Sequence, residues 1–418
     1  MHAKVSSILR HVVAGALLLS AAIRGISADV VIDWNVAMTS FSEAQPPGTA
    51  PFIEARIYAM AHLAMLDAIT EAGGQCNHGW KHHGPASAEA AAAQAAHNVL
   101  VNQFPSGAAS FDVLLATQLA AIPDGTLKTR GIAIGADAAA EILAKRANDG
   151  AAMETGPYTP GTNPGDYQPT PPFDGPPFNG FVDGVNWGKV TPFLMKSGSQ
   201  FRAPAPYKLT DLDYTFDLNE IKALGSLGSL DRTPDQTAVA FFWYENGSFG
   251  WNRMARILIA QHGGDLLNHA RLLALLNAAM TDASIASCDS KFFYNFWRPI
   301  TAIQKADTDG NDLTVADPSW QPLFLTPPVP DYPSNHAAMG GAASTVLVSF
   351  FGDANTFTFP STSGAPRTYH KISDAAKENC LSRMLVGIHF RLACEIGYEQ
   401  GIDVGSWAVK HAARLDDR

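Results

Sequence analysis

The chain has 418 residues, of which 46% are hydrophobic and 16% are charged, and its formal net charge is -10. This composition is typical of a folded globular protein and excludes an intrinsically disordered one, which would be more charged and less apolar. A net acidic chain without a long basic run repels phosphate, so we expect no nucleic-acid partner.

The first 28 residues have the pattern of a secretory signal peptide. Lys4 and Arg10 precede an apolar stretch at residues 12–23, and the sequence Ile26-Ser27-Ala28 that follows has the small residues of a cleavage site. Twelve apolar residues are too few to cross a bilayer, which takes about 20 in a helix. A buried N-terminal helix is the alternative. We therefore expect cleavage after Ala28, no transmembrane segment in the mature chain of residues 29–418, and a secreted or periplasmic location.

Helical periodicity predicts an all-α fold, and few alternating stretches favour strands. We expect one helical domain over residues 29–418, with N-terminal helices at about 50–150 and catalytic helices at about 209–414. The expected helices cover residues 52–72, 88–101, 111–122, 132–146, 211–224, 233–244, 251–280 and 337–351.

Two stretches rich in proline, glycine and aromatic residues interrupt this pattern, at residues 154–208 and 307–333. Irregular segments of this length in a compact domain usually form functional walls or lids. A linker between two domains is the alternative, but the aromatic side chains favour docking onto a surface.

The four cysteines are Cys76, Cys288, Cys380 and Cys394. We expect Cys380 and Cys394 to share one helical stretch, where fourteen residues would separate them by about 21 Å and keep them unpaired unless the chain reverses. Cys288 with Cys380 is a conceivable disulfide in an oxidising compartment. A metal site at Cys76, with His78, His82 and His83, is a weaker hypothesis than an exposed loop.

An acidic stretch at residues 307–312 has a spacing that is partly similar to a calcium loop. It lacks a first acidic ligand, because Lys305 stands there, and Ala316 stands where the bidentate glutamate would be. A plain turn is therefore the preferred interpretation.

Three segments of the last third carry polar residues in an apolar setting. Lys291 and Arg298 would lie two turns apart on one face of a continuous helix, and two buried cations are costly unless they share an anion. Snorkelling side chains are the alternative for this pair. Ser334 suits the N-cap of the following helix, whose free N–H groups attract oxyanions, and His336 would sit in its first turn.

The third segment holds Arg383 and His389, six residues apart. On a regular helix these two would be about 120° out of phase, so they could reach one point only if the helix breaks. Gly387 is a plausible break. The segments of Ser334 and of His389, each taken alone, are more often structural than functional, and a lone His389 is usually a satisfied core histidine.

Together the segments resemble the signature of the vanadium-dependent haloperoxidase and type 2 phosphatidic acid phosphatase superfamily. The shared pattern is Lys, six residues, Arg-Pro; then Pro-Ser-x-His; then Ser-Arg, five residues, His. The segments that begin at Arg56, Trp187 and Leu218 are similar to secreted bacterial haloperoxidase-like proteins. The resemblance implies an all-helical fold with the site inside helical bundles.

The resemblance also implies roles for the residues of this site. His389 would bond to the central atom of a tetrahedral oxyanion, either as metal ligand to vanadium or as phosphoryl-accepting nucleophile. His336 would be the acid/base group. The oxyanion, vanadate or phosphate, would be held by Lys291, Arg298, Arg383, the Ser334 hydroxyl and the Asn335 backbone N–H.

Three functions follow from this resemblance. The first is a vanadate-dependent haloperoxidase that oxidises halide with hydrogen peroxide. The alternative is an acid phosphatase that acts on a phosphoester through a phosphohistidine and needs no cofactor. The second alternative is a catalytically silent oxyanion-binding protein. The oligomeric state stays open.

The sequence departs from the family pattern at three positions. Asn335 replaces the usual glycine, Val329 stands where haloperoxidases tend to place an aromatic residue or histidine, and Ala393 replaces the aspartate four residues after the last histidine. Without that aspartate, we expect a backbone carbonyl to orient His389. A carbonyl adds no negative charge, which favours the haloperoxidase over the phosphatase.

Overall fold

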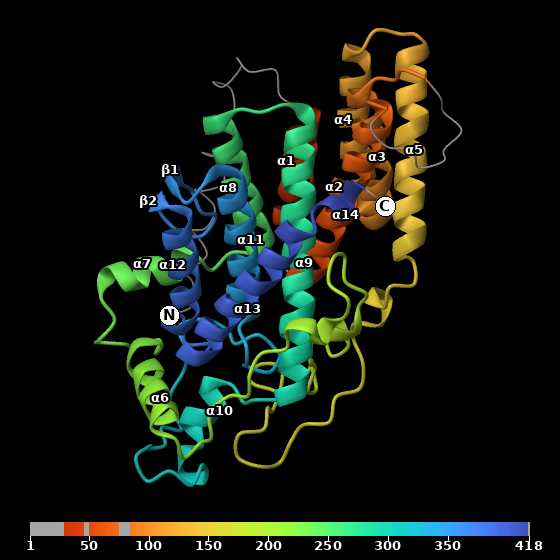
Figure 1. The fold of residues 1–418 in the computed structure, drawn as a ribbon. Coiled ribbons are helices and arrows are strands. Elements are labelled where there is room, and N and C mark those ends of the chain that lie inside the picture. Colours follow the sequence, from red (N-terminus) through yellow and green to blue (C-terminus); the bar gives the residue numbers. More distant parts are fainter. Residues whose placement is uncertain (1–28, 46–49, 75–83, 417–418) are drawn as a thin grey trace, which may run out of the picture.

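The computed structural model describes residues 29–45, 50–74 and 84–416, and these residues confirm the predicted all-α fold (Figure 1). The expected signal peptide and the group around Cys76 lie outside these ranges. The helices are α1 (Val30–Glu43), α2 (Pro51–Ala72), α3 (Ala88–Gln103), α4 (Ala108–Ala121), α5 (Thr126–Arg146), α6 (Leu212–Leu224), α7 (Pro234–Phe242), α8 (Gly247–His262), α9 (Leu266–Tyr294), α10 (Pro299–Gln304), α11 (Asn335–Phe351), α12 (Ile372–Leu385), α13 (Arg391–Lys410) and α14 (Ala413–Asp416). A small antiparallel sheet joins β1 (Ala354–Phe359) to β2 (Arg367–Lys371).

The long helix α9 runs through the middle of the molecule (Figure 1). It packs against α2 and also against α11 and α13, while α3 and α5 pack on α2. Side chains of α9 are therefore buried on all sides from Leu272 to Cys288. A helix that is covered all round shows no amphipathic stripe, because no face of it meets water.

The backbones of α11 and α13 lie unusually close because small residues line their contact. Glycines recur at four-residue spacing, and so on one helix face, from Gly397 to Gly405. A methyl group added at Gly401 would lie 2.0 Å from the Ala338 carbonyl oxygen, and one at Gly397 would lie 2.5 Å from the Ser334 carbonyl oxygen. This contact fixes the start of α11, which carries Ser334 and the residues after it.

The proline-rich segment over residues 154–208 packs along α9, as expected for a wall. Trp187 is fully buried, and its Nε1 donates to Ser284 Oγ at 2.9 Å. Arg202 forms a two-pronged ion pair with Asp289, at 2.7 and 3.0 Å. These contacts tie the segment to α9 at several points, so it does not behave as a free linker.

Two predicted helices are wrong because glycines break them. The helix predicted over residues 251–280 is divided between α8 and α9 by Gly263 and Gly264, whose φ angles are 72° and 147°. Gly387, with φ of 83°, likewise separates α12 from α13, so the stretch predicted to hold both Cys380 and Cys394 reverses. Glycine adopts such angles without steric cost.

Cys288, Cys380 and Cys394 are free and buried, so the conceivable Cys288–Cys380 disulfide is absent. Residues 309–314 form an ordinary turn, in which the Asp309 carboxylate accepts from Thr314 Oγ1 at 2.7 Å. Within the described part of the chain, no helix has both the length and the apolar character that a membrane span requires.

The contact between α11 and α13 predicts that Gly401→Ala destabilises the protein. Alanine is intrinsically better than glycine in a helix by about 1 kcal/mol. The added methyl, 2.0 Å from the Ala338 carbonyl oxygen, would force the helices apart, and overpacking of this kind typically costs about 1–3 kcal/mol or more. Denaturant unfolding should therefore show a net loss of stability. Gly228→Ala, where a methyl meets no atom within 4 Å, is the control, and equal stability of the two variants would contradict the prediction.

Candidate active site

A cavity of about 560 Å³ brings together residues that are far apart in the sequence. Predicted site residues on its surface are Lys291, Arg298, Asn335, His336, Arg383 and His389. Ser334 is fully buried at the N-cap of α11, where its Oγ accepts from the Ala337 N–H at 3.4 Å. That acceptor role leaves the hydroxyl hydrogen available to a ligand.

Lys291 and Arg298 do not share a helix, so the continuous helix predicted for them is wrong. α9 ends at Tyr294, Asn295 is left-handed with φ of 52°, and Arg298 is the N-cap of α10. Both side chains nevertheless bind one loop, residues 327–333. Lys291 Nζ donates to the Pro330 and Asp331 carbonyls at 2.7 and 2.9 Å, and Arg298 Nε donates to the Val329 carbonyl at 2.7 Å.

Arg383 reaches the same cavity from the last turn of α12, because the chain turns at Gly387 before it reaches His389. Its Nη1 donates to the Trp243 carbonyl at 3.2 Å, and its Nε is buried without a hydrogen-bond partner in the described chain. Burial lowers the pKa of Arg383 to about 10 and that of Lys291 to about 7. Both shifts reflect the cost of holding positive charge away from water.

The three buried basic residues of the cavity, Lys291, Arg298 and Arg383, have few carboxylate partners. Such a cluster favours the binding of an anion. Asp331 is the carboxylate beside this cluster, with its Oδ1 3.6 Å from Arg298 Nη1. Lys291 and Arg383 form no ion pair within the described residues. A tetrahedral oxyanion such as vanadate would supply the missing charge and accept from guanidinium, ammonium and helix N–H donors. The donor set therefore fits vanadate.

His389 faces a carboxylate, so the prediction that a backbone carbonyl orients it is wrong. Its Nδ1 lies 2.9 Å from Asp331 Oδ1, close enough to hydrogen-bond although the two groups are not yet well aligned. Catalytic pairs often align only when a ligand binds. Asp331 was not predicted from the sequence, because it lies three residues before Ser334 and not near Ala393, where the family pattern places its aspartate. Burial raises the pKa of Asp331 to about 7, against the opposing effects of Arg298 and Lys291.

His336 occupies the first turn of α11, as expected, and borders the cavity. Its Nε2 lies 2.7 Å from Asn379 Nδ2, which can only donate, so the ring proton belongs on Nδ1. Nδ1 faces Gly247, where an added methyl would lie 3.7 Å away. Burial, together with Arg383, lowers the pKa of His336 well below its usual value, so the ring is neutral.

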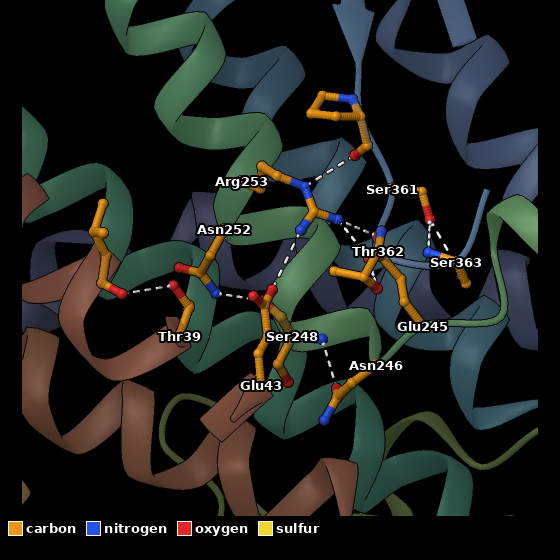
Figure 2. Close-up of polar contacts among 12 residues, drawn as sticks. Thr39, Glu43, Glu245, Asn246, Ser248, Asn252, Arg253, Ser361, Thr362 and Ser363 are labelled. Atoms are coloured by element: carbon orange, nitrogen blue, oxygen red, sulfur yellow. Dashed lines mark hydrogen bonds and ion pairs between the residues drawn. The ribbon is translucent and has the colours of Figure 1, made fainter. Parts of the chain in front are cut away.

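One wall of the cavity is acidic, which no motif predicted. Its carboxylates are Glu43, Glu54, Asp183 and Glu245. Arg253 joins two of them, with Glu245 at 2.5 Å and Glu43 at 3.3 Å (Figure 2). Glu54 accepts from the Asn246 amide and has no cation partner among the described residues. Burial raises the pKa of Glu54 to about 8 and that of Asp183 to about 6.

The raised pKa of Glu54 predicts a pH-dependent stability. Between its ordinary value of 4.5 and about 8, the folded state holds a proton that the unfolded state releases. Stability must therefore fall as pH rises through this window, by at most about 1.4 kcal/mol per pH unit. Glu54→Gln removes this group, so its unfolding free energy should fall less than that of the wild type between pH 5 and pH 8. Parallel pH profiles from denaturant unfolding would refute this assignment.

Comparisons with known proteins agree with this geometry. The family model described as the VCPO second helical-bundle domain matches residues 271–418, the range that contains all seven predicted site residues. The vanadium chloroperoxidase of Curvularia inaequalis is 29% identical over 198 residues, which cover 40% of this chain and 32% of that protein. The match thus spans about a third of the length of this curated relative.

Solved structures match nearly the whole chain. A bacterial vanadium-dependent iodoperoxidase has a TM-score of 0.74 and 26% identity, and the match covers 91% of this chain and 95% of that one. A holo-type bacterial vanadium-dependent chloroperoxidase has a TM-score of 0.70 at 18% identity, over 90% and 95% of the two chains, and shows the shared fold. The chain therefore has the fold of the vanadium-dependent haloperoxidases, and its residues 271–418 match their second helical-bundle domain.

Proposed function

We propose that this protein is a vanadate-dependent haloperoxidase that oxidises a halide with hydrogen peroxide. The observation that carries the proposal is the cluster of three buried basic side chains, Lys291, Arg298 and Arg383, at one cavity. Its similarity over most of its length to a bacterial iodoperoxidase supports the same reaction class. The signal-peptide pattern of residues 1–28 supports an exported enzyme.

The described residues divide the work of such a site. The three cations and the Asn335 backbone N–H would hold vanadate, the Ser334 hydroxyl would add a donor, and His389 would be the protein ligand to the metal. Bound vanadate would supply a Lewis acid that activates hydrogen peroxide toward halide. Lys291 and Arg298 are already held by loop carbonyls, so little side-chain entropy would be lost on binding.

His336 would manage protons. It carries its hydrogen on the cavity side, and its pKa is lowered by burial and by Arg383. A bound oxyanion opposes both effects, because negative charge nearby favours the protonated ring. The histidine would then be neutral in the empty site and able to donate a proton once the anion is bound.

A phosphatase is the second candidate, and one observation favours it. The Asp331 carboxylate beside His389 supplies the negative charge that Ala393 does not, so the expected argument against an activated histidine no longer holds. The same cations would hold a phosphoester, and no cofactor would be needed. Water would later cleave the phosphohistidine.

A paired assay should separate these functions. Purified full-length protein loaded with orthovanadate should oxidise iodide or bromide only when hydrogen peroxide is present, and a generic phosphoester should be hydrolysed slowly or not at all. Phosphoester turnover without peroxide, inhibited competitively by vanadate, would instead establish the phosphatase. Vanadate binding without either turnover would leave an oxyanion-binding protein.

Arg383→Ala should weaken binding of orthovanadate by at least about 1.5 kcal/mol, or roughly tenfold, because a hydrogen bond to a charged group is lost. Arg383 is the cleanest of the three cations to test, since it makes one hydrogen bond to protein, to the Trp243 carbonyl. Arg232→Ala is the matched control, because this arginine also bonds to carbonyls but lies outside the cavity lining. Titration calorimetry should show unchanged affinity for the control, and equal losses in both variants would argue against a direct role of Arg383.

A further inference from the structure

Asp331 is a buried carboxylate placed between two groups of the site. It is fully shielded from water, with its Oδ1 2.9 Å from His389 Nδ1 and 3.6 Å from Arg298 Nη1. Its own backbone is fixed on both sides: its N–H donates to the Phe296 carbonyl at 2.9 Å, and its carbonyl accepts from Lys291 at 2.9 Å. The residue that carries this costly buried carboxylate is therefore held in place through its backbone, by Phe296 and Lys291.

Two neighbours of His389 fit the same tautomer. A carboxylate can only accept, so the nitrogen that faces Asp331, Nδ1, must carry the proton. A guanidinium can only donate, and Arg298 Nη1 lies 3.1 Å from Nε2, somewhat closer than its 3.3 Å from Nδ1. The shorter of these contacts fits a lone pair on Nε2. Burial and the three nearby cations lower the pKa of His389 well below its usual value, so the ring is neutral and its tautomer matters.

We propose that Asp331 is the positioning residue of His389: it fixes the proton on Nδ1 and so presents the Nε2 lone pair to the bound oxyanion. The carboxylate thus comes from the loop before α11, and not from the first turn of α13, where Ala393 has no polar side chain. The same loop carbonyls bind Lys291 and Arg298, so one short segment sets both the cations and the ligand histidine. The proposal deepens the proposed function, but the orientation of His389 holds for vanadate and phosphate alike.

The first test needs no variant. Nitrogen-15 NMR of histidine-labelled, full-length protein without vanadate reports the tautomer of each neutral ring, and His389→Gln identifies the resonances of His389. We expect the proton of His389 on Nδ1. A proton on Nε2 would overturn the proposal, whether or not the protein oxidises halide.

The second test uses Asp331→Asn, which keeps the shape of the side chain and removes its charge. Loss of a carboxylate partner typically weakens metal binding about 10–100-fold, so we expect at least about a tenfold loss of orthovanadate affinity and a mixture of His389 tautomers. Asp309→Asn is the matched control, since Asp309 is also a buried carboxylate but bonds to Thr314 away from the cavity.

The control should lose stability without changing vanadate affinity or the His389 spectrum. Asp331→Asn with wild-type affinity and a single Nδ1–H tautomer would show that Asp331 is merely structural. Absence of halide oxidation by the wild type, with the expected tautomer and affinity loss, would instead count against the proposed function and leave the positioning role intact.

Discussion

The close approach of the α11 and α13 backbones is the constraint on which the cavity depends. Glycines on α13 let the carbonyls of Ser334 and Ala338 come within a distance that no side chain would allow. The Ser334 N–H then donates to the Ala393 carbonyl at 2.7 Å, which ties the start of one helix to the first turn of the other. His336 and His389 flank this junction, so their separation is set by main-chain contact and not by flexible side chains.

Burial of positive charge is the second constraint, and backbone carbonyls make it tolerable. Lys291 and Arg298 both donate to carbonyls of residues 329–331, whose partial negative charges offset part of the lost hydration. Carbonyl dipoles cannot neutralise a cation, so the site keeps a net demand for an anion. Asp331 meets part of that demand and leaves the rest for a ligand.

Much of the site could be predicted from the sequence because its chemistry lies in three short motifs. Lys291, Arg298, Arg383 and the two histidines reach one cavity even though the helix predicted across Lys291 and Arg298 does not exist. The spacing of the motif identified the residues, but Lys291 and Arg298 do not lie on one helix as predicted, because a left-handed Asn295 ends α9 before Arg298.

The remaining features could not be read from local patterns. Gly263 and Gly264 lie between two long helices, and the helical spacing of apolar residues continues from one helix to the next, so the break between them was not predicted. Asp331 is 58 residues from His389 and meets it only because the loop before α11 folds over Arg298. The acidic wall comes from segments such as α1 and α2 that share no motif with the oxyanion-binding residues, so only tertiary packing reveals it.

The residues that line the cavity come from two separate parts of the chain. The groups that would hold an oxyanion all come from residues 291–389, whereas much of the remaining lining comes from residues 42–45 and 51–54, from Asp183 and from residues 244–249. The two sets are contributed by different helices and loops. Substitutions in the second set can therefore change the size and charge of the molecules that reach the first set, while the cations and histidines stay in place. Such a division lets one reactive centre diversify its specificity without rebuilding its chemistry.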